Sequence, residues 1–250
     1  MDGWQEGWDK QLQRDREWAR WALQQWSAFP ARGQRPLVLV GPAIWSQGGF
    51  LDGAAKLAYL SGDWQLPPSV PTAVLATARA NMRGGATRRR DGPPLEIHTA
   101  HRTSARFETD RGPLNLSAWQ LHSDQAKGPI WVLDPELASG AWAPALVVSD
   151  PTFIHPPHGQ TFQATTVGSE GTRLRVSFGG GSPRCVEYLS AEVLESERAV
   201  VVLPEAHDIG PPGFRTWKGY TRDVVAELGR PLGDRVLVDV DASPVAVLSL

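Results

Sequence analysis

The chain has 250 residues, of which 41% are hydrophobic and 21% charged, and its formal net charge is -2 at pH 7. That length can bury a sizeable core in one large or two modest domains. The charge gives no reason to expect binding to nucleic acid or to anionic lipid. The single cysteine, Cys185, excludes an intrachain disulfide and a thiolate zinc site.

The first residues, MDGWQEGWDKQLQRDREW, contain no apolar stretch of the kind that a signal peptide carries. No run approaches the roughly 18 apolar residues of a membrane-spanning helix. We therefore expect a cytoplasmic protein without a membrane span.

Residues 1–33 are predicted to form a Trp-rich amphipathic helix that Pro30 and Gly33 end. Asp15 is the one acidic residue inside its apolar face. The members of that face fall within about 120° of one another on a helical wheel: Trp4, Trp8, Leu12, Trp18, Ala22, Trp26 and Phe29.

This apolar face must be covered, and two explanations stay open. In the first, it packs on the body of the same chain. In the second, Trp4, Trp8, Trp18 and Trp26 form a surface for a protein partner or for self-association, because Trp is enriched at binding hot spots. A helix lying on a membrane is disfavoured because residues 1–26 carry five acidic and four basic side chains.

Short elements follow the helix. The apolar run Leu37–Val40 predicts a buried strand, Ala54–Leu60 a helix that Gly62 stops, and the residues after Pro71 another helix. The stretch RGGATRRRDGPP, Arg83–Pro94, is a loop with four arginines. It has no interleaved aromatic residues, so we expect it to be solvated and predict no nucleic-acid partner.

From Leu95 the pattern turns to strands separated by turns, as in antiparallel sheets. The 21 prolines and 25 glycines agree with many short elements. We predict a mainly β or α+β protein, with an α+β domain at 34–150 and an antiparallel β module at 151–250. The alternative is one compact unit, because the boundary rests on a proline-rich connection at 135–160.

The stretch RPLGDRVLVDVDASPVAV, Arg230–Val247, is predicted to be a terminal β-hairpin that closes the sheet. Val236, Val238 and Val240 form one apolar face, and Asp241 opens a turn that Pro244 completes. Its aspartates lack the regular spacing around a glycine that a calcium loop requires.

Three stretches carry a resemblance to a known group of proteins. They are GPLNLSAWQLHS followed by GPIWVLDP, then TRLRVSFGGG with Cys185 after three more residues, and lastly the C-terminal RPLGDRVLVDVDASPVAV. In these the chain, from about Arg35 to Val247, resembles uncharacterised actinobacterial proteins, many of them exported, for which no function is assigned.

Members of that group tend to have a second cysteine in the region that matches residues 214–220, which implies a disulfide to the position of Cys185. Here GFRTWKGY, Gly213–Tyr220, contains none. Either a reducing compartment or aromatic packing by Trp217 and Tyr220 would account for the difference.

Histidines are the candidates for metal chemistry. His155 and His158, with Asp150 nearby, could form a metal site in a proline-rich loop. His98 and His101 have the same spacing, but on a strand positions three apart point to opposite faces. Glu205, His207 and Asp208 are predicted to lie in a polar turn.

No G-x-S-x-G elbow, phosphate loop or dinucleotide fingerprint is present. We therefore expect a non-catalytic binding or assembly protein that uses β faces or the Trp-rich helix, with no cofactor. The alternative is a metal-assisted hydrolase that uses His155 and His158.

Overall fold

The computed structural model describes residues 2–30, 34–81, 93–144, 161–210 and 219–248, and of residues 2–11 it describes the backbone alone. The helices are α1 (Asp2–Gln25), α2 (Gly53–Ser61), α3 (Thr72–Asn81) and α4 (Pro135–Gly140). The strands are β1 (Ile44–Ser46), β2 (Trp64–Gln65), β3 (Leu95–Glu96), β4 (Thr99–Thr109), β5 (Gly112–His122), β6 (Ile130–Leu133), β7 (Thr161–Thr166), β8 (Arg173–Gly180), β9 (Val186–Glu195), β10 (Ala199–Asp208), β11 (Tyr220–Glu227), β12 (Val236–Val238) and β13 (Ala246–Leu248). The predicted β-rich fold with an N-terminal helix is confirmed.

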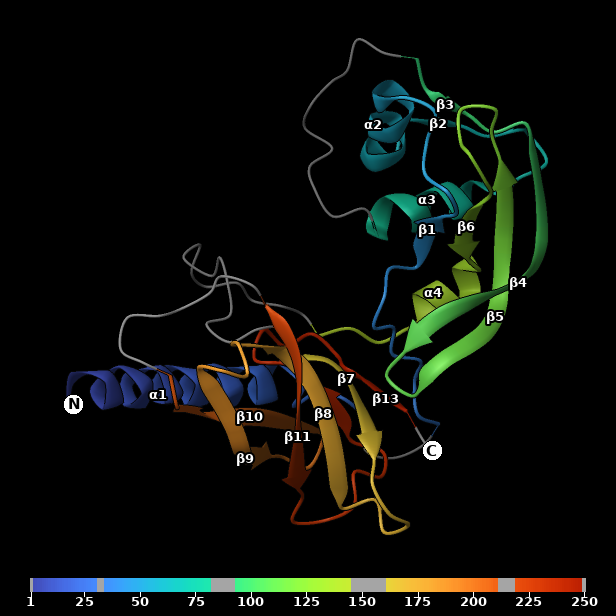
Figure 1. The fold of residues 1–250 in the computed structure, drawn as a ribbon. Helices are drawn as coiled ribbons and strands as arrows, with labels where there is room; N and C mark the ends of the chain where they lie inside the picture. Colours follow the sequence, from blue (N-terminus) through green and yellow to red (C-terminus); the bar gives the residue numbers. More distant parts are fainter. Residues whose placement is uncertain (1, 31–33, 82–92, 145–160, 211–218, 249–250) are drawn as a thin grey trace. The chain divides into compact units, whose positions relative to one another are not determined.

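The chain divides into two compact units (Figure 1). The first unit comprises Met1–Val40, Thr109–Gly112 and Trp142–Leu250, and the second comprises Gly41–Glu108 and Pro113–Ala141. The N-terminal helix and the C-terminal strands therefore belong to one unit, whereas the sequence pattern placed a boundary near residue 150.

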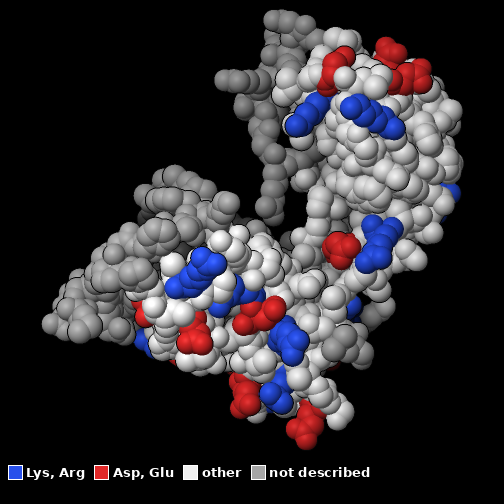
Figure 2. All heavy atoms as spheres, viewed as in Figure 1, with Lys and Arg blue, Asp and Glu red and all other residues white. Residues whose placement is uncertain are grey.

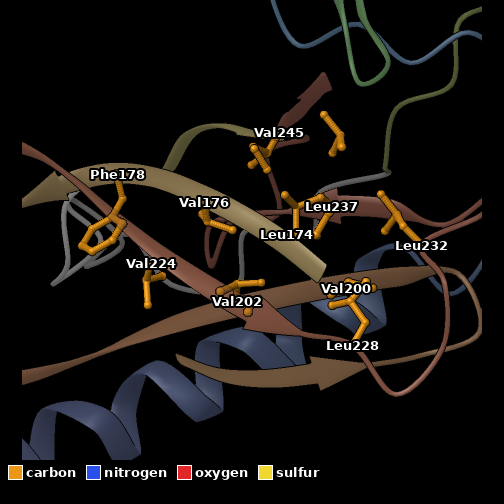
Figure 3. Close-up of a cluster of buried hydrophobic side chains, with 13 residues drawn as sticks. Leu174, Val176, Phe178, Val200, Val202, Val224, Leu228, Leu232, Leu237 and Val245 are labelled. Carbon is orange, nitrogen blue, oxygen red and sulfur yellow. The ribbon is translucent and has the colours of Figure 1, made fainter. Parts of the chain in front are cut away.

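Two sheets of the first unit enclose its larger core. The strand orders are β12-β10-β9 and β11-β8-β7-β13. Strand β8 alternates, with Leu174, Val176 and Phe178 buried and Arg173 and Arg175 exposed. Figure 3 shows these side chains meeting Val200 and Val202 of β10 and Val224 of β11. Successive side chains of a strand point to opposite faces, which explains why apolar and polar residues alternate along β8.

Helix α1 covers the opposite face of the sheet that contains β10. Ala19, Ala22 and Trp26 pack with Val201 and Val236. The run Ala199–Leu203 is buried throughout because β10 has the other sheet on one face and α1 on the other. The helix thus packs on its own unit over the half whose side chains are described.

The C-terminal strands join the two sheets. The predicted terminal hairpin is present as one antiparallel bridge, Val238 with Pro244, and as the hydrogen bond from the Val245 N–H to the Leu237 carbonyl (2.9 Å). Beyond it the chain departs from the prediction, because β13 pairs in parallel with β7 of the other sheet. Strand β12 also pairs in parallel, with β10.

A buried arginine holds the loop that precedes β12. The Arg235 guanidinium donates to the carbonyls of Arg230 (2.7 Å), Pro231 (3.0 Å) and Leu232 (3.3 Å). It also forms an ion pair with Glu195, whose carboxylate accepts from the Gly229 N–H (2.6 Å). The planar guanidinium supplies all these donors at once, which explains the RPLGDR stretch as a structural feature.

The second unit contains a four-stranded sheet, in the order β1-β6-β5-β4, with α2 and α3 on one face, and a two-stranded sheet of β2 and β3. Asp52 caps α2 by accepting from the Ala55 N–H (2.7 Å), and Gly62, at φ 67°, ends the helix in the left-handed region as predicted. Helix α3 follows Pro71, which confirms that prediction too.

Three local predictions were wrong. Leu37–Val40 forms only one bridge, between Leu39 and Thr109, in place of a buried strand. Residues 135–140 are helical because Asp134 caps the Glu136 N–H (3.1 Å). Residues 205–208 continue β10, because a register shift after Glu205 lets them pair with β9.

In the part of the chain that the structure describes, no helix has both the length and the apolar character needed to cross a membrane.

Candidate functional site

The predicted Trp-rich surface comprises four tryptophans, and the structure describes the side chains of two of them, Trp18 and Trp26. Trp26 is completely buried, and its indole N–H donates to the Ala242 carbonyl (2.9 Å). Trp18 is half-buried and meets Trp21 edge-on, with ring centroids 6.0 Å apart. The side chains of Trp4 and Trp8 lie outside the described residues. Trp26 therefore offers no area to a partner, and Asp15 is buried too, so the described half of this face points inward.

The predicted metal ligands Asp150, His155 and His158 lie outside the described residues, so that site stays a prediction. Among the residues that the structure does describe, no three His, Cys, Asp or Glu side chains come together as metal ligands would. Cys185 is buried.

A row of ring side chains lies on one face of the second unit's sheet. Trp45 on β1 is the register partner of Trp131 on β6, and Trp131 is the partner of Gln120 on β5. The two indole rings are stacked, with centroids 5.7 Å apart and planes 25° from parallel. Three neighbouring strands thus place two indoles and one amide side by side.

Two histidines extend this row toward the edge of the sheet. His122 follows Gln120 by two positions on β5, so the strand period places it on the same face. Its ring stacks on that of His101 on β4, with centroids 5.8 Å apart and planes 19° from parallel. We call Trp45, Trp131, Gln120, His122 and His101 the ring row.

The histidine end of the ring row continues into the turn after β5. The His98 N–H donates to the His122 carbonyl (2.9 Å), and His98 Nε2 lies 3.3 Å from an Asp124 carboxylate oxygen. His98 thus contacts this acid and does not converge with His101 on one ion.

The ring row lies on the face of the sheet opposite to α2 and α3, beside Ala118 and Leu133, which are buried on that same face. On the same strands the alternate residues Ile44, Val132, Trp119 and Leu121 pack in the core beneath α2 and α3. Four members of the ring row are half-buried and His101 is exposed. Part of each of these side chains therefore lies at the surface, but the Trp131 Nε1 atom does not.

One donor in the ring row is unsatisfied. The Trp131 Nε1–H is buried and has no hydrogen-bond partner among the described residues. A buried donor without a partner costs about 1–3 kcal/mol, and native proteins contain few of them. Such a position is a candidate for function more than for stability.

The ring row contains no permanently charged side chain. Arg102, on β4 beside His101, contacts Ser117 (3.1 Å) and the Asp134 carboxylate (2.7 Å), which lie toward the other face. Figure 2 shows Lys, Arg, Asp and Glu side chains scattered over the visible surface, without a field of one sign. Chemically, the ring row offers apolar ring surface with donors and acceptors, and it holds no nucleophile paired with a base.

One carboxyl with a strongly shifted pKa lies in the first unit. Burial raises the pKa of Asp239 to about 6, although its carboxylate accepts from the N–H groups of Val240 (2.9 Å) and Thr161 (3.1 Å). Its contacts hold the start of β7 to the turn after β12, so we assign it a structural role.

Sequence patterns did not predict the ring row because its members come from four strands. The alternation in WQLH places Gln120 and His122 together, and that signal is present in the sequence. The partners of these residues, however, follow from strand order and register, which no local pattern contains.

Comparisons with known proteins gave no match: no family model, no curated protein and no solved structure matches the chain. The fold and the ring row define a two-unit, β-rich protein with an aromatic sheet face. The resemblance to the actinobacterial group stays a prediction.

Proposed function

We propose that this protein is a non-catalytic binding protein whose ligand lies against the ring row. The observation that carries the proposal is the placement of four rings and one amide on the sheet face opposite to α2 and α3. Binding sites combine aromatic surface with a few polar groups in this way.

Stabilisation of the sheet alone is the competing explanation, because aromatic pairs across strands contribute to stability. It accounts for the two stacked pairs. It does not account for Gln120 and His122 in place of apolar residues. A binding role accounts for these two polar side chains.

The test is a fragment screen in which binding is detected by shifts of the tryptophan indole N–H signals in proton–nitrogen NMR spectra. The library spans sugars, nucleosides, aromatic acids and dipeptides. We expect binding fragments to shift the signals of Trp45 and Trp131. Trp64 and Trp119, which pack in the core on the other side of the sheet, serve as internal controls.

His101→Ala supplies the matched variant, because this exposed side chain can be removed without opening the core. We expect it to weaken fragment binding by about tenfold. The control is Leu51→Ala, which removes a side chain that is 63% exposed in the same unit and lies outside the ring row. If no fragment shifts Trp45 or Trp131, or if both variants bind alike, the proposal is wrong.

A further inference from the structure

We infer that the ligand of the ring row is a neutral carbohydrate. This inference rests on the proposed function and adds the chemical class of the ligand. Three properties of the ring row lead to it: its charge, its hydrogen-bonding groups and its place on the sheet.

The charge of the ring row argues against ionic ligands. Binding of nucleic acid or another polyanion depends on Lys and Arg, and none belongs to the row. The neighbouring Arg102 is already bound to Asp134 and Ser117. The row holds no carboxylate that would favour a cationic ligand either. A neutral ligand is the electrostatic complement of a neutral surface.

The hydrogen-bonding groups match hydroxyls. The Gln120 amide both donates and accepts, and the imidazole side chain of a histidine can do the same. A hydroxyl group also donates and accepts, so a sugar can pair with any of these groups in either sense. The two indoles beside them supply the apolar surface that the C–H faces of a sugar ring require.

The place of the ring row argues against an extended peptide. Peptides that add to a sheet bind through the backbone groups of an edge strand. The ring row lies on the face, and its side chains come from β1, β6, β5 and β4. It therefore crosses the strands, as a binding surface for a short chain of sugar rings would.

Affinity electrophoresis tests this inference with the full chain. Native gels would contain a soluble β-glucan, an α-glucan, a xylan, a galactomannan or a glycol-chitin. We expect at least one of these neutral polysaccharides to retard the protein at pH 7.5. We expect Trp45→Ala and His101→Ala each to weaken the retardation at least tenfold in apparent affinity. Trp45→Phe, which keeps a ring, should retain most of it.

The controls are Leu51→Ala in the same unit and His207→Ala in the first unit, both of which should migrate like the wild type. Thermal unfolding of every variant establishes that it is folded. Equal retardation of Trp45→Ala, His101→Ala and the controls would place carbohydrate binding elsewhere and overturn the inference.

The outcomes separate the two proposals. If no neutral polysaccharide retards the protein, while nucleosides or dipeptides shift the Trp45 and Trp131 signals, the inference fails and the proposed function stands. If no fragment shifts the Trp45 and Trp131 signals, the proposed function fails and the inference that rests on it fails too.

Discussion

Asp239 has a carboxyl group whose ionisation the fold opposes. Burial raises its pKa to about 6 from the ordinary value of 3.8. Between these values the folded protein binds the proton more tightly than the unfolded chain. The stability that this group contributes is therefore fully present below about pH 4 and is lost as the pH rises through 6.

We predict that this group alone lowers the free energy of unfolding by about 2 kcal/mol between pH 4 and pH 7.5. Asp239→Asn, which cannot ionise, should have a flatter dependence on pH. Urea unfolding of both proteins at several pH values measures the difference. Asp223→Asn, which changes an exposed carboxyl bonded to Ser177, is the control and should follow the wild type. Parallel curves for wild type and Asp239→Asn would contradict the prediction.

Residue patterns predicted the candidate site only in part. They predicted that His98 and His101 point to opposite faces of a strand, whereas His98 lies between β3 and β4 and its ring is next to Asp124. They did not show that the ring of His101 lies on that of His122. These two residues are 21 positions apart in sequence, and only strand pairing joins them.

At the scale of elements, the pairing of β1 with β6 depends on one close approach between the residue after β1 and the segment before β6. A Cβ added to Gly128 would lie 2.4 Å from the carbonyl oxygen of Gln47. That backbone is held in place, because the Gln47 N–H donates to the Pro129 carbonyl (2.9 Å). Only glycine fits between the two segments.

Gly128→Ala is therefore expected to lower the free energy of unfolding by about 1–3 kcal/mol and to separate the Trp45 and Trp131 rings. The matched control is Gly53→Ala. A Cβ at Gly53 meets nothing within 4 Å, and alanine favours the helix that begins there. Thermal unfolding compares the two variants, and equal melting temperatures would show that the close approach is not rigid.

Elements with their own stop signals were the ones that the sequence predicted well. Helix α2 has a capping aspartate before it and Gly62 after it, and α3 follows a proline. Leu37–Val40 has a strand composition but a single bridge, because composition does not supply a neighbouring strand. Strand β10 runs on through a polar segment because β9 is there to pair with it.

At the scale of the whole molecule, Trp26 connects the two ends of the chain. Its ring packs against Phe29 (centroids 5.6 Å apart) and Trp142 (4.5 Å), and its N–H donates to Ala242, 216 positions away. Trp26→Ala would leave a cavity in this cluster and an unpaired carbonyl.

We expect Trp26→Ala to lower the free energy of unfolding by about 3–5 kcal/mol, and Trp26→Phe to cost less because it refills part of the volume. Denaturation followed by circular dichroism measures both. Tyr220→Ala, an exposed aromatic in the same unit, is the control and should change stability little. A Trp26→Ala protein as stable as that control would mean that α1 is not part of the core.

The sequence by itself determined the β-rich class, the extent of α2 and the start of α3, because these follow from local periodicity and from capping residues. Which way the apolar face of α1 points was left open. The two units, the parallel pairing of β12 and β13 and the ring row were decided only by the tertiary structure. Each of these depends on which distant segments lie side by side. The same alternating strand can pair with several neighbours, and the choice among them is made by the packing of the whole chain.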